Sequence, residues 1–215
     1  MSRQHPDPPV ALILNAGGQS RRMGQPKALL PVPGSGQPLA LHIVRRLRPL
    51  AAGGLVVVTN QAEIARLFPP EEGVQVLGDA YPGGALGGLA TGLGACDGWA
   101  MAVACDMPLV SREIFAWLIQ LVSRELDEGG AERWDAVVPL VAGYPQSFHA
   151  LYHRRCLPAI EATLRRGERR VASFLADVRT RYVTEEEIRP LDPALRSFLN
   201  VNTPEEWAAV RPFLT

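Results

Sequence analysis

Two adjacent glycines, two arginines and one lysine fall within residues 14–27, which read LNAGGQSRRMGQPK. Glycines let the backbone pass close to a ligand, and Arg21, Arg22 and Lys27 supply the positive charge that an anion requires. The segment predicts a phosphate-binding loop; the alternative is a solvated basic turn. It is neither the G-x-G-x-x-G pattern nor the P-loop pattern, because Lys27 is followed by Ala28.

A single aspartate, Asp106, follows the strongly apolar stretch WAMAVAC in the segment ACDMPLV. A carboxylate at the end of a buried strand can hold Mg²⁺, which takes one or two carboxylates together with phosphate oxygens. The alternative is an aspartate that only caps the turn before Pro108. Its expected place opposite a phosphate loop favours the magnesium site.

A third segment, GDAYPGGALGGLATGL, places Asp79 at a strand end and six glycines within residues 83–94. Each glycine in a helix costs about 1 kcal/mol relative to alanine, so something must approach this backbone closely. A flat base lying on residues 85–87 would fit. The alternative is tight packing of a helix on a sheet, which accounts for Gly92 and Gly94 in either case.

Apolar strands that alternate with helical patterns must position these residues. Strands are predicted at 10–14, 55–59, 74–77, 99–105, 135–140 and 147–153, and helices at 39–50, 62–68, 86–95, 112–128, 154–166 and 171–178. A last helix begins with Thr203 as N-cap and Pro204 at its first position. The pattern predicts an α/β fold with a mostly parallel sheet covered on both faces. Ligands of such sheets lie beyond the carboxyl ends of the strands, where residues 14–27 and Asp106 both fall.

The composition limits the classes of partner. The 22 basic and 22 acidic residues cancel, so no global charge attracts nucleic acid or an acidic membrane. Three cysteines (Cys96, Cys105 and Cys156) lack metal-ligand spacing and indicate packed thiols in a reducing compartment, by default the cytoplasm. Residues 1–9 lack an apolar segment and are predicted to be a mobile tail, and residues 10–215 a single domain.

Four segments in order, NAGGQSRRMGQPKALLPVPGSGQPL, GDAYPGGALGGLATGL, ACDMPLVS and FLNVNTPEEW, resemble the motifs of the molybdenum cofactor guanylyltransferase family, also called molybdopterin-guanine dinucleotide biosynthesis protein A. The resemblance implies a three-layer, Rossmann-like nucleotidyltransferase fold. It also implies transfer of GMP from GTP to a molybdopterin-type cofactor, with Mg²⁺ as cofactor and pyrophosphate as the second product. Molybdoenzyme-maturation proteins are the partner proteins that it suggests.

The resemblance also implies roles for individual residues. Arg22 and Lys27 match phosphate-binding positions, Asp106 matches the magnesium aspartate, and Asn200 and Asn202 match asparagines on the acceptor side. The implied nucleotide-binding residues are Asn15, Ala16, Gly17, Gly18, Lys27, Asn60, Asp79, Ala85, Leu86, Gly87 and Asp106. Asn15 replaces the usual leucine, and Pro26 replaces an acidic residue often found before the lysine.

The implied reaction agrees with the residues present. Its nucleophile is a phosphate monoester that is already anionic near neutral pH, so the site requires charge neutralisation and alignment rather than a general base. Two alternatives stay open: a related cytidylyl- or sugar-phosphate nucleotidyltransferase, and a nucleotide-binding protein without turnover. An oxidoreductase with a dinucleotide fold is disfavoured because its glycine fingerprint is absent.

Overall fold

The computed structural model describes residues 8–18, 21–70, 73–81, 84–125 and 133–214. Most of the predicted tail at 1–9 therefore lies outside the described residues. Eight strands form the sheet: β1 (Ala11–Asn15), β2 (Leu55–Val58), β3 (Val74–Leu77), β4 (Trp99–Ala104), β5 (Ala136–Val141), β6 (Tyr144–Pro145), β7 (His149–His153) and β8 (Thr180–Val183). Seven run in the order β3-β2-β1-β4-β7-β5-β6, and β8 pairs with β5.

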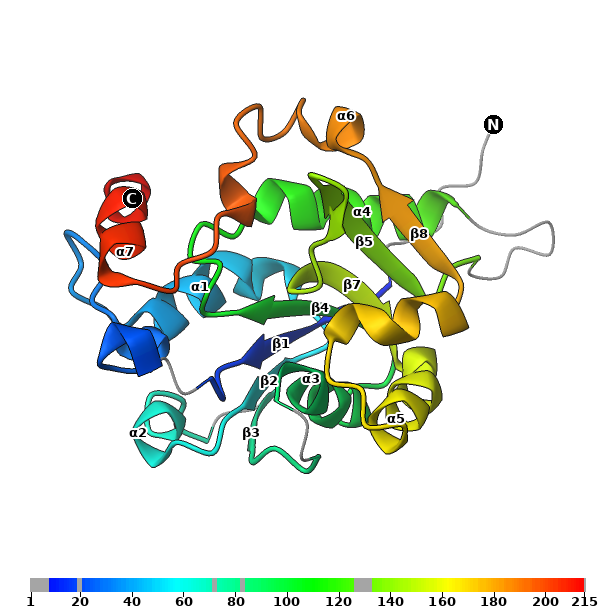
Figure 1. The fold of residues 1–215 in the computed structure, drawn as a ribbon, viewed down its shortest axis with the longest axis horizontal. Helices are drawn as coiled ribbons and strands as arrows, with labels where there is room; N and C mark the ends of the chain where they lie inside the picture. The colour runs from blue at the N-terminus through cyan, green and yellow to red at the C-terminus, as the bar shows by residue number, and fades with distance from the viewer. Residues whose placement is uncertain (1–7, 19–20, 71–72, 82–83, 126–132, 215) are drawn as a thin grey trace.

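The sheet is mixed and mostly parallel. Strands β1, β2, β3 and β4 pair in parallel, as do β5 and β8, whereas β7 is antiparallel to both β4 and β5. In register, Asn15 lies beside Val58 of β2 and Ala104 of β4, so three strands end at one edge. We call it the carboxyl edge. The arrows of β1 and β4 in Figure 1 point toward this edge.

Helices cover both faces of the sheet, as the apolar strands predict (Figure 1). The helices are α1 (Leu39–Leu47), α2 (Ala62–Ala65), α3 (Ala85–Gly94), α4 (Arg112–Arg124), α5 (Leu157–Arg165), α6 (Glu185–Ile188) and α7 (Pro204–Val210). Alternate residues of β1 separate two cores: Leu12 packs in the cluster that includes α1 and α4, and Ile13 in the cluster that includes α3 and α5. The predicted three-layer arrangement is therefore confirmed.

Several predicted elements differ in extent or type. The helix predicted at 112–128 ends at Arg124, and residues 126–128 lie outside the described part. The segment predicted as a short helix at 171–178 is a 3₁₀ helix, Val171–Asp177. Thr203 caps α7 as predicted, because its hydroxyl accepts from the Glu206 N–H. The three cysteines are free and buried, and no helix within the described ranges is long and apolar enough to cross a bilayer.

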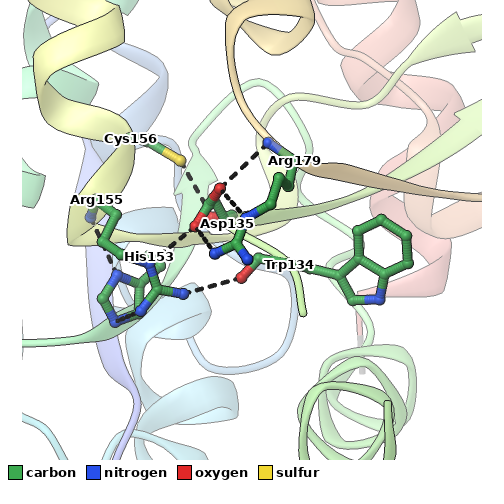
Figure 2. A network of polar contacts seen from close by, with 6 residues as sticks. All are labelled: Trp134, Asp135, His153, Arg155, Cys156 and Arg179. Carbon is green, nitrogen blue, oxygen red and sulfur yellow. Dashed lines mark hydrogen bonds and ion pairs between the residues drawn. The ribbon is translucent and has the colours of Figure 1, made fainter. Parts of the chain in front are cut away.

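The opposite edge of the sheet holds an ionic cluster centred on Asp135, just before β5 (Figure 2). The Asp135 carboxylate accepts from Arg155 Nε at 2.8 Å and from Arg179 Nε and Nη2 at 2.9 and 2.8 Å. Arg155 also donates to the Trp134 carbonyl. The hydrogen bonds from Arg179, with those from Arg155, hold the pKa of Asp135 far below its usual range. This cluster ties the start of β5 to the segments before α5 and β8.

Candidate active site

A cleft of about 220 Å³ opens at the carboxyl edge of the sheet. It lies where β1, β2 and β4 end in register, so the backbone loops that leave these strands form its walls. Nine of the predicted nucleotide-binding residues line it: Asn15, Ala16, Gly17, Gly18, Lys27, Asn60, Asp79, Ala85 and Asp106. The structure thus brings together residues that are up to 91 positions apart in the sequence (15 to 106).

The glycine loop after β1 is tied to the loop after β2. The Ala16 N–H donates to the Val58 carbonyl at 2.9 Å, and the Thr59 hydroxyl donates to the Ala16 carbonyl at 3.3 Å. Gln61 Nε2 donates to the Gly18 carbonyl. No described atom outside its own neighbours lies within 4 Å of the position a Cβ would take at Gly18. The loop therefore presents an open backbone surface to the cleft, as close approach of a ligand requires.

Lys27 begins the 3₁₀ helix Lys27–Leu29, and its side chain reaches the C-terminal part of the chain. Its Nζ donates to Asn202 Oδ1 at 2.8 Å. The neighbouring Val201 N–H donates to the Asp106 carbonyl at 2.7 Å. The Lys27 ammonium and the backbone of Asp106 are therefore joined by one short segment from the C-terminal region, Val201 and Asn202.

Asp106 is half-buried, and one oxygen of its carboxylate, Oδ1, is buried without a hydrogen-bond partner among the described residues. Burial raises the pKa of Asp106, while the nearby charge of Lys27 acts in the opposite direction. A carboxylate that lines the cleft and keeps one oxygen unpartnered fits a hard divalent cation. No group of three or more His, Cys, Asp or Glu side chains within the described ranges could hold a metal ion. A cation at Asp106 would therefore need oxygens from a bound phosphate, as Mg²⁺ commonly does.

The other wall of the cleft begins at the ends of β2 and β3. Asn60 Oδ1 accepts from the Asp79 N–H at 2.9 Å, which fixes the two strand ends together. Asp79 Oδ1 accepts from the Tyr81 N–H at 3.0 Å and from the Thr91 hydroxyl at 3.1 Å. Asp79 thus closes a turn onto α3 and also lines the cleft, where a nucleoside would meet it.

Helix α3 points its N-terminus into the cleft through Gly84 and Ala85. Gly84 has φ 61°, a conformation that favours glycine. Leu86 and Gly87 are buried and do not line the cleft. They could therefore contact a base only through their backbone N–H groups, which lie in the first turn of the helix and lack partners within it. The contact with a base stays a prediction.

Close packing explains three of the glycines in α3, one against the loop after β3 and two against β1. A Cβ at Gly87 would lie 2.3 Å from the Tyr81 carbonyl oxygen, and one at Gly88 would lie 2.6 Å from Asn15 Nδ2. At Gly92 it would lie 2.5 Å from Ile13 Cγ2. Gly94 has no such constraint, since its nearest atom is 4.0 Å away. The packing alternative therefore accounts for Gly92 and not for Gly94.

Five predicted site residues are not among those that line the cleft: Leu86 and Gly87, described above, and Arg22, Asn200 and Asn202. Arg22, in the 3₁₀ helix Arg21–Met23, is exposed, and so is Asn200. Phe148 does line the cleft, although no motif pointed to it. It precedes β7, and only the antiparallel pairing of β7 with β4 places it beside the end of β4. Its neighbour His149 is fully buried and stacks on Phe115 at 4.6 Å.

The fold and the cleft are those of an α/β nucleotidyltransferase: a mostly parallel sheet with a glycine loop, a lysine and a half-buried carboxylate at its carboxyl edge. A family model described as the MobA-like NTP transferase domain matches residues 11–182. The chain therefore belongs to the MobA-like NTP transferase family.

Relatives and solved structures extend this likeness over nearly the whole chain. A probable molybdenum cofactor guanylyltransferase of Pelotomaculum thermopropionicum is 32% identical over 201 residues, 93% of this chain and 90% of that protein. A molybdenum cofactor guanylyltransferase of Vibrio cholerae is 32% identical over 91% of this chain and 88% of its own. Molybdopterin-guanine dinucleotide biosynthesis protein A of Archaeoglobus fulgidus shares the fold, with a TM-score of 0.76 at 24% identity, covering 95% and 98% of the two chains.

Proposed function

We propose that this protein transfers GMP from GTP to a molybdopterin-type cofactor and releases pyrophosphate. The observation that carries the proposal is the single cleft that Gly17, Gly18, Lys27 and Asp106 all line, with one carboxylate oxygen of Asp106 unpartnered among the described residues. The names of full-length relatives at 32% identity support the choice of guanine nucleotide and acceptor.

The reaction requires little acid–base chemistry. An anionic oxygen of the acceptor's phosphate monoester attacks the α-phosphorus of GTP, and the bond from that phosphorus to the bridging oxygen of the β-phosphate breaks. No proton has to be removed from the nucleophile, and the described residues lining the cleft include no histidine or serine. Lys27 holds the β- and γ-phosphates, so that charge on the departing pyrophosphate meets an ammonium.

Asp106 is the residue that would hold Mg²⁺, and the ion would neutralise charge on the reacting phosphates. The thiol of the adjacent Cys105 is not a competing nucleophile. Burial is the main cause that raises the pKa of this thiol to about 12, and the charge of Asp106 acts in the same direction. The thiol therefore stays protonated near neutral pH.

Nucleotide choice tests the proposal against the cytidylyl alternative. Guanine presents acceptors at O6 and N7, which suit the first-turn N–H groups of α3, whereas cytosine and adenine present an amino group. Calorimetric titration with GTP, CTP, ATP and UTP in the presence of Mg²⁺ should give a GTP affinity at least about tenfold above the others. Equal affinities, or a preference for CTP, would remove the guanylyl assignment.

A further inference from the structure

The hydrogen bond between Lys27 and Asn202 joins residues that are 175 positions apart. The match to the family model ends at residue 182, so the partner of the phosphate-loop lysine lies beyond the matched domain. The resemblance in the sequence placed Asn202 on the acceptor side. Its amide oxygen instead contacts the ammonium predicted to bind the nucleotide's phosphates.

The backbone around Asn202 is fixed from both sides. Before it, the Val201 N–H donates to the Asp106 carbonyl, and the Val201 side chain is buried. After it, the N–H groups of Asn202 and Thr203 both donate to Glu206 Oε2, in a capping box that begins α7. The Asn202 side chain therefore projects from a braced turn toward Lys27.

An amide oxygen suits this contact better than a carboxylate. It accepts a hydrogen bond without adding a negative charge beside the ammonium, so the contact does not weaken the attraction of the lysine for phosphate. An ammonium has three donors, so a bond to Asn202 is compatible with bonds to a ligand. A lysine side chain is otherwise long and flexible, and ordering it before binding reduces the entropy that binding costs.

We propose that Asn202 is a positioning residue: it holds the Lys27 ammonium at the place where the β- and γ-phosphates of a nucleoside triphosphate bind. The proposal deepens the proposed function and rests on it for the identity of the ligand. The C-terminal segment then sets the distance between Lys27 and Asp106, because the same turn bonds to both residues.

A double-mutant cycle measured by calorimetry with Mg²⁺ tests this coupling. Asn202→Ala should weaken GTP binding about tenfold and leave GMP binding unchanged, because GMP lacks the phosphates that Lys27 meets. In the Lys27→Ala background, Asn202→Ala should change GTP affinity less than about twofold. An equal loss in both backgrounds, or an equal loss for GMP, would overturn the proposal.

A second readout needs no nucleotide. Lys27 is the only lysine in the chain, so it and the N-terminal amine are the two primary amines that an acylating reagent can reach. With trace acetic anhydride and mass analysis, Asn202→Ala should raise acylation of Lys27 relative to the N-terminal amine about threefold or more, and Asn202→Asp should lower it by ion pairing.

The control for both experiments is Gln75→Ala, which removes an exposed amide from β3, away from the cleft lining. It should change neither the labelling ratio nor GTP affinity. An unchanged labelling ratio in both Asn202 variants would overturn the positioning role. Failure of the wild-type protein to bind GTP would instead count against the proposed function, since the labelling result does not depend on the nucleotide.

Discussion

The ionised carboxylate of Asp106, which suits a metal ion, is expected to lower the stability of the folded state. One oxygen of this half-buried carboxylate is buried and lacks a partner among the described residues, so ionising the carboxyl group costs free energy that nearby Lys27 only partly offsets. A pKa raised in the folded state means that the bound proton favours folding. This stabilisation is complete below the pKa of an unfolded aspartate, about 3.9, and is lost as the pH rises through the folded-state pKa.

Asp106→Asn should therefore separate stability from chemistry. Without Mg²⁺ at pH 7, we expect the variant to be more stable than the wild type by about 1 kcal/mol, because it removes a partly buried charge. The difference should shrink as the pH falls toward 4. Turnover should fall by about a thousandfold, while GTP still binds through Lys27 and α3.

Melting temperatures from pH 4 to 8, GTP affinity and turnover of the two proteins check this prediction. The control is Asp97→Asn, which neutralises a fully exposed carboxylate near Arg154 and should leave all three unchanged. If Asp106 were only a turn cap, the variant would keep its stability and its activity, because asparagine caps turns as well as aspartate does.

Motifs predicted the single residues that we expect to do chemistry, but not the contacts between them. The glycine loop, Lys27 and Asp106 follow strand ends, where local sequence suffices to predict a ligand edge. The bond from Lys27 to Asn202 spans 175 positions and depends on where the chain returns after β8. Phe148 depends likewise on the pairing of β7 with β4, which no local pattern encodes.

At the scale of elements, α3 has two roles. Its N-terminus lines the cleft, and its glycines let the helix lie close to β1. Gly92→Ala should destabilise the fold by about 2 kcal/mol, because the new Cβ would lie 2.5 Å from Ile13 Cγ2 in a fully buried core. Gly94→Ala, the matched control in the same helix, should be neutral or stabilising by up to about 1 kcal/mol. Chemical denaturation of both variants measures the difference. Equal effects would contradict the close-packing account of α3.

The sequence pattern predicted the buried apolar strands, but it did not predict the partly exposed strand β8. The five strands from β1 to β5 each fall within or beside a predicted apolar run. Strand β8 was missed because TRYV begins with two consecutive polar residues and only Val183 is buried, so no alternation of polar and apolar residues shows. Helix α6 has four residues, three of them glutamates, too few for an apolar periodicity to show.

At the scale of the whole molecule, the proposed active site and the Asp135 ion-pair cluster lie at opposite edges of the sheet. The carboxyl edge holds the cleft, and the opposite edge holds the Asp135 cluster (Figure 2). Asp135→Asn should lower the free energy of unfolding by about 2 kcal/mol at pH 7, because it breaks charge-assisted bonds to Arg155 and Arg179. Turnover should stay within about twofold of the wild type.

The pH dependence of the Asp135 variant is opposite in sign to that of Asp106→Asn. A pKa depressed in the folded state gives stability above the unfolded pKa of about 3.9 that is lost as the pH falls toward the folded-state pKa. The difference in the free energy of unfolding between the wild type and Asp135→Asn should therefore become smaller below about pH 4. Unfolding curves at pH 7 and pH 3 check it, and a constant gap would contradict the ionic account of the cluster.

The most direct test of the central claim is turnover itself. Purified protein is incubated with molybdopterin, Mg²⁺ and each nucleoside triphosphate in turn, and the products are identified by mass. With GTP, we expect an adduct heavier than molybdopterin by one guanylyl group, together with one equivalent of pyrophosphate. Formation of a cytidylyl adduct in preference, or GTP binding with no adduct under conditions where molybdopterin is intact, would contradict the account.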